Sequence, residues 1–278
     1  MRSRDDVSSL EVPWPYGVMP TSMTKLARQA YAAAVSYMDA QVGSVLRALD
    51  GAGLRSSTLC VLLGDHGWQL SERGEWAKFS NADVATRVPL LVRPAGVAAA
   101  PPRYSHALVE LVDLWPSLAE LAGVPQPPLC GPEGGAQRTC VEGSSWAAHA
   151  RPSPPAREPP SKPAVFSQYP RPATSPRGPD DGNTDLPSLV NITVMGYSMR
   201  TAPARRYTEW VGFRGSYAAN GTILTTGPLW DTVHARELYD LEDDPLELRN
   251  LADEPARAAE VAVLARQLRR GWRGALVA

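Results

Sequence analysis

The chain has 278 residues, which is enough for one large domain or two modest ones with a real hydrophobic core. Its 28 Lys and Arg side chains nearly balance its 29 Asp and Glu side chains, so no overall charge draws it to nucleic acid or to an anionic membrane. The hydrophobic content of 44% excludes wholesale disorder. No apolar run approaches the ~18 residues of a membrane span, and the first residues lack the apolar stretch of a signal peptide, so we expect neither feature in this sequence.

The first half of the chain is predicted to alternate between helices and short strands. Residues 1–22 show no periodicity and are expected to be a connecting segment. Apolar residues then recur at spacings of three and four over 26–49, which predicts an amphipathic helix. Apolar runs at 57–64 and 88–92 predict strands, and a further helix is predicted over 108–121. This alternation is typical of an α/β sheet covered by helices.

The second half is predicted to be a loop followed by a small subdomain. Residues 126–163 are rich in proline and glycine, which predicts a loop. Candidate strands at 191–200 and 206–213 and a helix at 255–274 predict a C-terminal α+β subdomain on a short antiparallel sheet. Three side chains of these strands are interpreted as structural, with a place in a substrate cleft as the alternative: Arg200, Arg206 and Trp210. The predicted division is an N-terminal extension, a core, a loop and a subdomain, at residues 1–22, 23–125, 126–163 and 164–278.

The cysteines and two glycosylation sequons indicate the compartment. Cys60 lies in an apolar run and is interpreted as an inert core residue. Cys130 and Cys140 lie ten positions apart in a polar loop, a spacing that can close a small disulfide ring. Asn191 and Asn220 each begin an Asn-x-Thr acceptor triplet. Together these features favour a secretory or lysosomal compartment.

The densest group of chemistry-bearing side chains lies at 64–81, directly after a predicted parallel strand. Open α/β sheets bind ligands at the carboxyl ends of such strands. Asp65 and His66 offer a carboxylate oxygen and an imidazole nitrogen, a partial shell for a divalent cation. Lys78 offers a positive charge suited to sulfate or phosphate, and Trp68 can line a pocket or stack on a sugar. The alternative is a turn with a helix cap and a solvated lysine.

Several segments of the chain resemble the sulfatase family. The most similar is Gly74-Glu-Trp-Ala-Lys-Phe-Ser-Asn-Ala-Asp-Val-Ala-Thr-Arg-Val-Pro-Leu90, which is closest to members that act on iduronate 2-sulfate. The other similar segments follow one another in order along most of the chain, at residues 31–54, 65–67, 113–123, 167–172, 195–201, 206–213 and 234–239. The middle of the chain and residues 214–230 do not share the resemblance.

The resemblance implies a partial alkaline-phosphatase-like sulfatase sandwich of α/β class with a small C-terminal α+β subdomain. It implies a sulfuric ester hydrolase that removes the 2-sulfate from iduronate ends of heparan and dermatan sulfate in the lysosome. By the match, Asp65 and His66 would be part of a Ca²⁺ shell, Lys78 would contact the sulfate ester, and Trp68 would lie close to the sugar. In this family a cysteine is oxidised to formylglycine, whose hydrate attacks sulfur while calcium neutralises charge on the transferring group.

The sequence also departs from the family. No cysteine begins the Cys-x-Pro/Ala-x-Arg motif, because Cys130 is followed by the proline but has Gly134 in place of the arginine. The family's paired aspartate ligands have no counterpart after a strand. We therefore expect this chain to correspond to the C-terminal part of a sulfatase, inactive by itself and weak in calcium binding, since Ca²⁺ usually takes about 6–8 ligands. The alternatives are a non-catalytic fragment or pseudoenzyme, and a metal-dependent phosphatase or phosphodiesterase.

Overall fold

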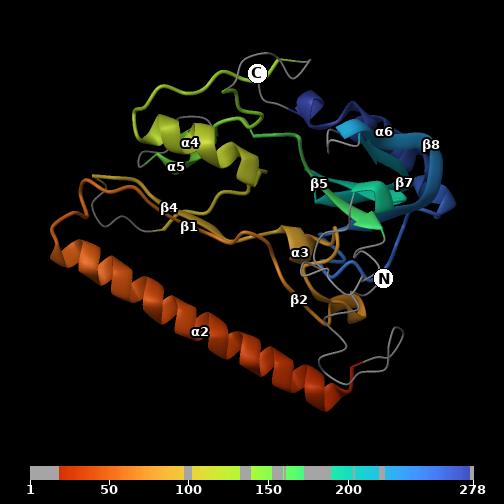
Figure 1. Cartoon of the computed structure of the whole chain (residues 1–278). Helices are drawn as coiled ribbons and strands as arrows, with labels where there is room; N and C mark the ends of the chain where they lie inside the picture. Colours follow the sequence, from red (N-terminus) through yellow and green to blue (C-terminus); the bar gives the residue numbers. More distant parts are fainter. Residues whose placement is uncertain are drawn as a thin grey trace. The chain divides into compact units, whose positions relative to one another are not determined.

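A computed structural model of the chain is shown in Figure 1. It describes residues 19–96, 102–131, 139–151, 159, 161–171, 189–202, 204–218 and 223–275. The helices are α2 (Thr21–Gly51), α3 (Asp83–Thr86), α4 (Leu114–Leu121), α5 (Ala147–Ala150) and α6 (Ala258–Arg270). The strands are β1 (Cys60–Leu63), β2 (Gln69–Leu70), β3 (Trp76–Ala77), β4 (Leu90–Arg93), β5 (Ala164–Arg171), β6 (Val194–Thr201), β7 (Arg205–Tyr217) and β8 (Ile223–Asp240). Short 3₁₀ turns are η1 (Glu72–Gly74), η2 (Leu111–Asp113), η3 (Leu189–Asn191), η4 (Pro255–Arg257) and η5 (Trp272–Ala275).

The chain divides into two compact units, each built from segments that are distant in sequence. Unit 1 contains Met1–Ala27, Asp65–Val88 and Phe166–Gly274, and unit 2 contains Arg28–Gly64, Pro89–Val165 and Ala275–Ala278. The segment predicted to carry the metal motif, Asp65–Val88, therefore groups with the C-terminal sheet. The two units also divide the predicted core of residues 23–125 between them.

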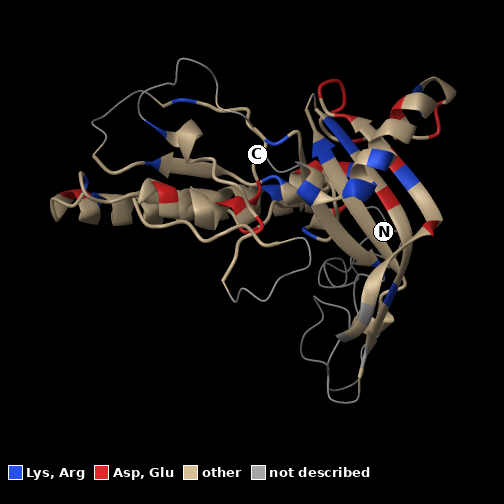
Figure 2. Ribbon diagram, turned by 90° about the horizontal axis from the view of Figure 1, so that it is seen from above, with Lys and Arg blue, Asp and Glu red and all other residues tan. Residues whose placement is uncertain are grey.

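Unit 1 is organised by a four-stranded sheet in the order β5-β6-β7-β8. The pairs β6–β7 and β7–β8 are antiparallel, with Thr201 opposite Arg205 and Arg205 opposite Asp240. This arrangement confirms the antiparallel C-terminal sheet predicted from the sequence. Basic and acidic residues are interspersed along its strands, as Figure 2 shows.

Helix α6 packs against β6 and β7 and contributes to the core of unit 1. Its Leu264 and Leu268 are buried, together with Met199, Tyr207 and Leu238 of the sheet. Each fully buried side chain of this size contributes about 1.5–3 kcal/mol relative to an exposed one. The helix ends before Gly271, whose φ of 69° suits glycine. The predicted C-terminal helix is thus confirmed, with η4 and η5 at its two ends.

The long helix α2 confirms the predicted amphipathic helix, but its apolar stripe remains exposed. The structure describes all 31 of its residues, and none is buried. Leu26, Tyr37 and Val45 are exposed by 58%, 70% and 69%. The described part of the chain therefore does not supply the apolar partner that the periodicity of this helix calls for. None of the helices in the described residues is both long and apolar enough to cross a membrane.

In unit 2, β1 and β4 pair antiparallel, with Cys60 opposite Arg93 and Leu63 opposite Leu90. The prediction that a parallel strand precedes the Asp-His motif is therefore wrong for the pairing that the structure describes. The Gly64 N–H donates to the Pro89 carbonyl over 3.2 Å, so the chain leaves and re-enters the ribbon at the same end. Parallel pairing would instead need a crossover connection to the opposite end.

Helix α4 confirms the later part of the helix predicted over 108–121.

A buried ion cluster lies just before α4 in the sequence and joins it to later segments of unit 2. The buried Lys162 ammonium lies 2.6 Å from carboxylate oxygens of both Glu110 and Asp113. Asp113 also accepts a hydrogen bond of 2.8 Å from the backbone N–H of Ser144. Because a buried cation is tolerated only when it is paired, this cluster ties Lys162, near the end of the proline-rich region, to the segment that precedes α4.

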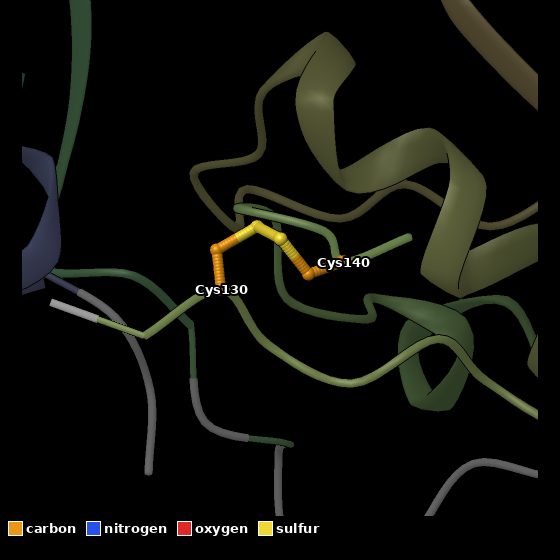
Figure 3. Close-up of a disulfide and its surroundings, with 2 residues drawn as sticks. All are labelled: Cys130 and Cys140. Carbon is orange, nitrogen blue, oxygen red and sulfur yellow. A yellow bond between two sulfur atoms is a disulfide. The ribbon is translucent and has the colours of Figure 1, made fainter. Parts of the chain in front are cut away.

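The predicted disulfide between Cys130 and Cys140 is present, with the Cα atoms 4.9 Å apart (Figure 3). Next to the disulfide, the Cys130 N–H donates to the Val141 carbonyl and the Val141 N–H donates to the Pro128 carbonyl, each over 2.9 Å. These two bonds hold the ends of the ring together. Cys60 is half-buried and accepts a 3.1 Å contact from Arg93, in keeping with a structural cysteine. Asn191 is exposed at the end of η3, and Asn220 lies outside the described residues.

Candidate functional site

The Asp-His motif is held in a turn that packs closely on α3. The Gly67 N–H donates to the Ala85 carbonyl over 2.9 Å. A Cβ atom at Gly67 would lie only 2.2 Å from the Val84 carbonyl oxygen, a distance that no side chain can occupy. Glycine is therefore required here, so that the turn carrying Asp65 and His66 can rest on the backbone of α3.

Replacing Gly67 with alanine is expected to lower the free energy of unfolding by about 1–3 kcal/mol, because the new methyl group forces two backbone segments apart. Urea unfolding followed by fluorescence measures this change. The matched control is Gly227→Ala in β8, where an added Cβ meets no atom within 4 Å. Equal stability of the two variants would contradict the close packing at Gly67.

The geometry of Asp65 and His66 fits two ligands of one cation. The His66 Nδ1 lies 2.8 Å from the Gly67 carbonyl oxygen, which can only accept, so Nδ1 carries the proton and Nε2 carries the lone pair of the neutral ring. That Nε2 lies 3.7 Å from Asp65 Oδ2. Two ligands that each bind Ca²⁺ at about 2.4 Å can be up to ~4.8 Å apart, so one ion can contact both atoms. The side chains are 89% exposed for Asp65 and 32% for His66, which leaves room for further ligands.

The pair supplies only part of a calcium shell. Within the residues that the structure describes, no group of three or more His, Cys, Asp or Glu side chains is placed to hold a metal ion. Two ligands fall short of the usual 6–8. The weak calcium binding expected for this chain alone therefore remains a prediction, which a calcium titration measures.

A short hairpin brings Trp68 and Lys78 to the same place. Strands β2 and β3 pair antiparallel with Gln69 opposite Ala77, so the residues just outside the pair, Trp68 and Lys78, flank the same end of the ribbon. The Trp68 ring stacks on the His66 ring with centroids 6.1 Å apart. The Lys78 ammonium lies 5.8 Å from the Phe79 ring, and it forms no ion pair with any carboxylate among the described residues. Its charge is therefore available to an anion.

Backbone strain is concentrated in this hairpin. Ser71, Arg73 and Ala77 have φ angles of 83°, 56° and 63°, which non-glycine residues rarely adopt. Each costs of order 1–3 kcal/mol and persists only where the surrounding structure enforces it. Such strain is commonly found at functional sites, and here it directly precedes Lys78.

A pocket of about 350 Å³ lies within unit 1, between this hairpin and the C-terminal sheet. Its lining combines residues of five elements, namely Arg73, Glu75, Ser80, Asn81, Ala82, Arg171, Val194, Arg206, Trp210, Ala235 and Glu237. Of the side chains that the sequence placed in the C-terminal strands, Arg206 and Trp210 line it, whereas Arg200 pairs with Asp83 at 3.4 Å. Arg171, Asn81 and Glu237 lie in segments that resemble the sulfatase family, but no pattern in the sequence predicted a role for any of them in a site.

A buried carboxylate and a half-buried one, those of Glu247 and Glu237, surround Arg206 beside the pocket. The guanidinium pairs with Glu247 and, at 3.1 Å, with Glu237. Burial works to lower the pKa of Arg206, but these carboxylates outweigh it and raise the pKa above the ordinary value. Burial likewise works to raise the pKa of Glu237, whereas the Arg206 charge and a 2.8 Å hydrogen bond from the Trp210 indole bring it below the ordinary value. Arg206 and Glu237 are thus both charged at neutral pH.

The fold defines the chain as an alkaline-phosphatase-like α/β protein. A putative sulfatase from Bacteroides thetaiotaomicron matches with a TM-score of 0.58 and 24% identity over 84% of this chain and 40% of that chain. A phosphonate monoester hydrolase from Silicibacter pomeroyi matches with a TM-score of 0.55 and 24% identity over 86% of this chain and 39% of that chain. Likenesses at this level of identity establish the fold alone.

Sequence similarity assigns the family within that fold. The profile of the Sulfatase family matches residues 13–124. Iduronate 2-sulfatase of Mus musculus is 41% identical over 280 residues, which cover 90% of this chain and 48% of the mouse protein. These matches confirm the resemblance to the sulfatase family and the fold expected from the sequence. It spans about half the length of the curated iduronate 2-sulfatases that it matches.

Proposed function

We propose that this chain is part of a sulfuric ester hydrolase of the iduronate 2-sulfatase kind, acting on 2-O-sulfated iduronate of heparan and dermatan sulfate. The observation that carries the proposal is the arrangement of Asp65, His66, Trp68 and Lys78 around one end of the β2–β3 ribbon. This arrangement occurs in a chain that is 41% identical to mouse iduronate 2-sulfatase. A cation, a sulfate ester and a sugar ring each find a suitable side chain there.

Each of these residues has a distinct role in the proposed reaction. Asp65 Oδ2 and His66 Nε2 would hold Ca²⁺, which when bound supplies positive charge to the sulfate oxygens. The Lys78 ammonium binds the sulfate ester and stabilises the charge that develops on the leaving oxygen. Trp68, 41% exposed, borders the sugar and excludes water from one side. The hydrogen bond from His66 Nδ1–H to the Gly67 carbonyl fixes the tautomer of the neutral ring in which Nε2 can face the metal.

The nucleophile is not supplied by this chain, since none of its three cysteines begins the formylglycine motif. We therefore infer that the active form combines these residues with a polypeptide segment that carries the nucleophile and the remaining calcium ligands. A lysosomal location is part of the proposal. It is supported by the Cys130–Cys140 disulfide and by the exposed Asn191 acceptor site, since both features form in the secretory route. The missing motif is also what favours the alternative, a non-catalytic fragment or pseudoenzyme.

Co-expression in mammalian cells of this chain with the part of mouse iduronate 2-sulfatase that it does not match tests the proposal. We expect the hybrid to release sulfate from an iduronate 2-sulfate disaccharide, and neither piece to do so alone. The two parts of the mouse enzyme, expressed as separate chains, are the control for assembly. An active control with an inactive hybrid would favour the non-catalytic alternative. Faster hydrolysis of a phosphate or phosphonate ester than of the sulfate ester would favour the phosphatase alternative.

A further inference from the structure

The arginines that line the pocket of unit 1 differ in how closely carboxylates approach them. Arg206 pairs with Glu237 and Glu247, and Arg73 lies 3.5 Å from Glu247. Arg171, in contrast, forms no ion pair among the residues that the structure describes. It donates to the Pro170 carbonyl over 3.1 Å, and this bond uses one of its five N–H groups.

The Arg171 guanidinium is held rigidly by aromatic rings. It lies 4.7 Å from the centroid of the Trp210 ring and 5.0 Å from that of Tyr169. The Trp210 ring is itself fixed, because a Cβ atom at Gly196 would lie 2.7 Å from it. The Trp210 indole N–H also donates to Glu237 over 2.8 Å. A planar guanidinium fixed in this way can present two parallel N–H groups to an oxyanion with little loss of side-chain entropy.

Burial makes an anion favourable at this position. Arg171 is half-buried, and this burial lowers its pKa from the ordinary value, although Tyr169, Glu75 and Glu237 act in the opposite direction. The carboxylates of Glu75 and Glu237 act on Arg171 from a distance and do not offset its burial, so an anion that contacts the guanidinium directly is favourable. Carboxylate, sulfate and phosphate groups match the fork of an arginine.

The rest of the pocket suits a hydroxylated ligand. Its volume of about 350 Å³ is near the lower end for a small-molecule site and fits a single ring better than a long chain. Ser80 and Asn81 add hydroxyl and amide groups to the lining, and Glu237 adds a carboxylate that can accept from hydroxyls. Glu75 and Ser80 both line the pocket, and Lys78 lies between them in the sequence. Lys78 is therefore close to the pocket, and a ligand whose ester binds at Lys78 can extend into it.

We infer that this pocket binds an anionic group of the glycosaminoglycan end beside the reacting ester, with the Arg171 guanidinium contacting either the sulfate of the adjoining amino sugar or the carboxylate of the uronate. The inference rests on the proposed function for the identity of the ligand, and it names a subsite that the Asp-His motif does not contain. Carboxylate and sulfate share the oxyanion chemistry that Arg171 recognises, so the test has an arm for each.

The test measures binding of a heparin disaccharide of uronate and N-sulfated glucosamine to the full chain by calorimetry and by the NMR signal of the Trp210 indole N–H. We expect that signal to shift on binding. We expect Arg171→Gln to raise the Kd at least ~10-fold, which is the effect of losing about 1.4 kcal/mol, and Arg171→Lys to restore only part of the affinity. The control is Arg214→Gln, an exposed arginine of β7 outside the pocket.

Two further disaccharides identify the bound group. An N-acetylated disaccharide keeps the carboxylate and lacks the sulfate, and a carboxyl-reduced disaccharide keeps the sulfate and lacks the carboxylate. The group whose removal reproduces the loss seen in Arg171→Gln is the one that Arg171 contacts. Undetectable binding of all three sugars, an unmoved Trp210 signal, or equal Kd values for Arg171→Gln and Arg214→Gln would overturn the inference. An inactive hybrid enzyme with sugar binding intact would instead refute only the proposed function.

Discussion

Replacing Arg206 with methionine is expected to lower the free energy of unfolding by about 3–5 kcal/mol, because it removes the closest counter-charge of the buried Glu247 and of the half-buried Glu237. Arg206 and Glu247 are 2% and 3% exposed, and water cannot take over the role of the guanidinium. Methionine preserves much of the side-chain volume, so the loss reports the electrostatic effect and not a cavity. Urea unfolding at neutral pH measures it.

A surface ion pair provides the matched control for this variant. Arg249 and Glu254 lie 2.5 Å apart, but the arginine side chain is 76% exposed. Arg249→Gln is expected to cost no more than about 1 kcal/mol, since solvent screens such a pair. Comparable losses in the two variants would show that the Arg206 cluster is solvated in solution.

The dependence on pH follows from the same cluster. Glu237 has a pKa held below its ordinary value of 4.5, so its contribution to stability is present above that pH and is lost as the pH falls through the pKa of the folded state. The difference in stability between wild type and Arg206→Met is therefore expected to be largest near neutrality and to shrink in acid. A difference that stays constant from pH 7 to pH 3 would contradict an ionised Glu237.

Replacing Lys78 with alanine is expected to lower kcat of the hybrid enzyme by about 10²–10³-fold, the usual effect of removing one preorganised donor from a developing oxyanion. Affinity for the sulfated disaccharide should change less than kcat, because charge on the leaving oxygen builds up only in the transition state. Steady-state kinetics on the iduronate 2-sulfate disaccharide separates the two quantities.

Lys25→Ala is the control for Lys78, since Lys25 is an exposed lysine of α2 outside the site. A thermal melt of each variant distinguishes loss of chemistry from loss of fold. If Lys78→Ala folds normally and retains full kcat, the role assigned to Lys78 is wrong, and the phosphatase or non-catalytic alternatives gain support.

Local patterns in the sequence were sufficient for several features of the structure. The apolar period over 26–49 predicts α2 because helix periodicity is a property of neighbouring residues. The spacing of Cys130 and Cys140 predicts their bond because a short ring brings its own ends together. The pairing of Asp65 with His66 is also local, since the two residues are adjacent in the chain.

Tertiary structure alone decided the features that join distant segments. Sequence reasoning expected a parallel strand before Asp65, whereas the contact of Gly64 with Pro89 turns the pairing antiparallel. The register of β2 and β3, which places Lys78 beside Trp68, depends on which residues pair across the turn. A one-residue slip in register would reverse the faces of the strand, and alternation of side chains says nothing about where a short strand pairs.

The pocket shows the same limit most clearly. Its Arg171 and Glu237 come from β5 and β8, and although both lie in segments that resemble the family, nothing in their local sequence predicts that they line one pocket. They become a site because folding removes water from Arg171 and places aromatic rings on it. The resemblance to the family, the helices and the Asp-His motif could therefore be predicted from the sequence alone. The pocket and its charge could not, because they arise only when strands far apart in the sequence pair with one another.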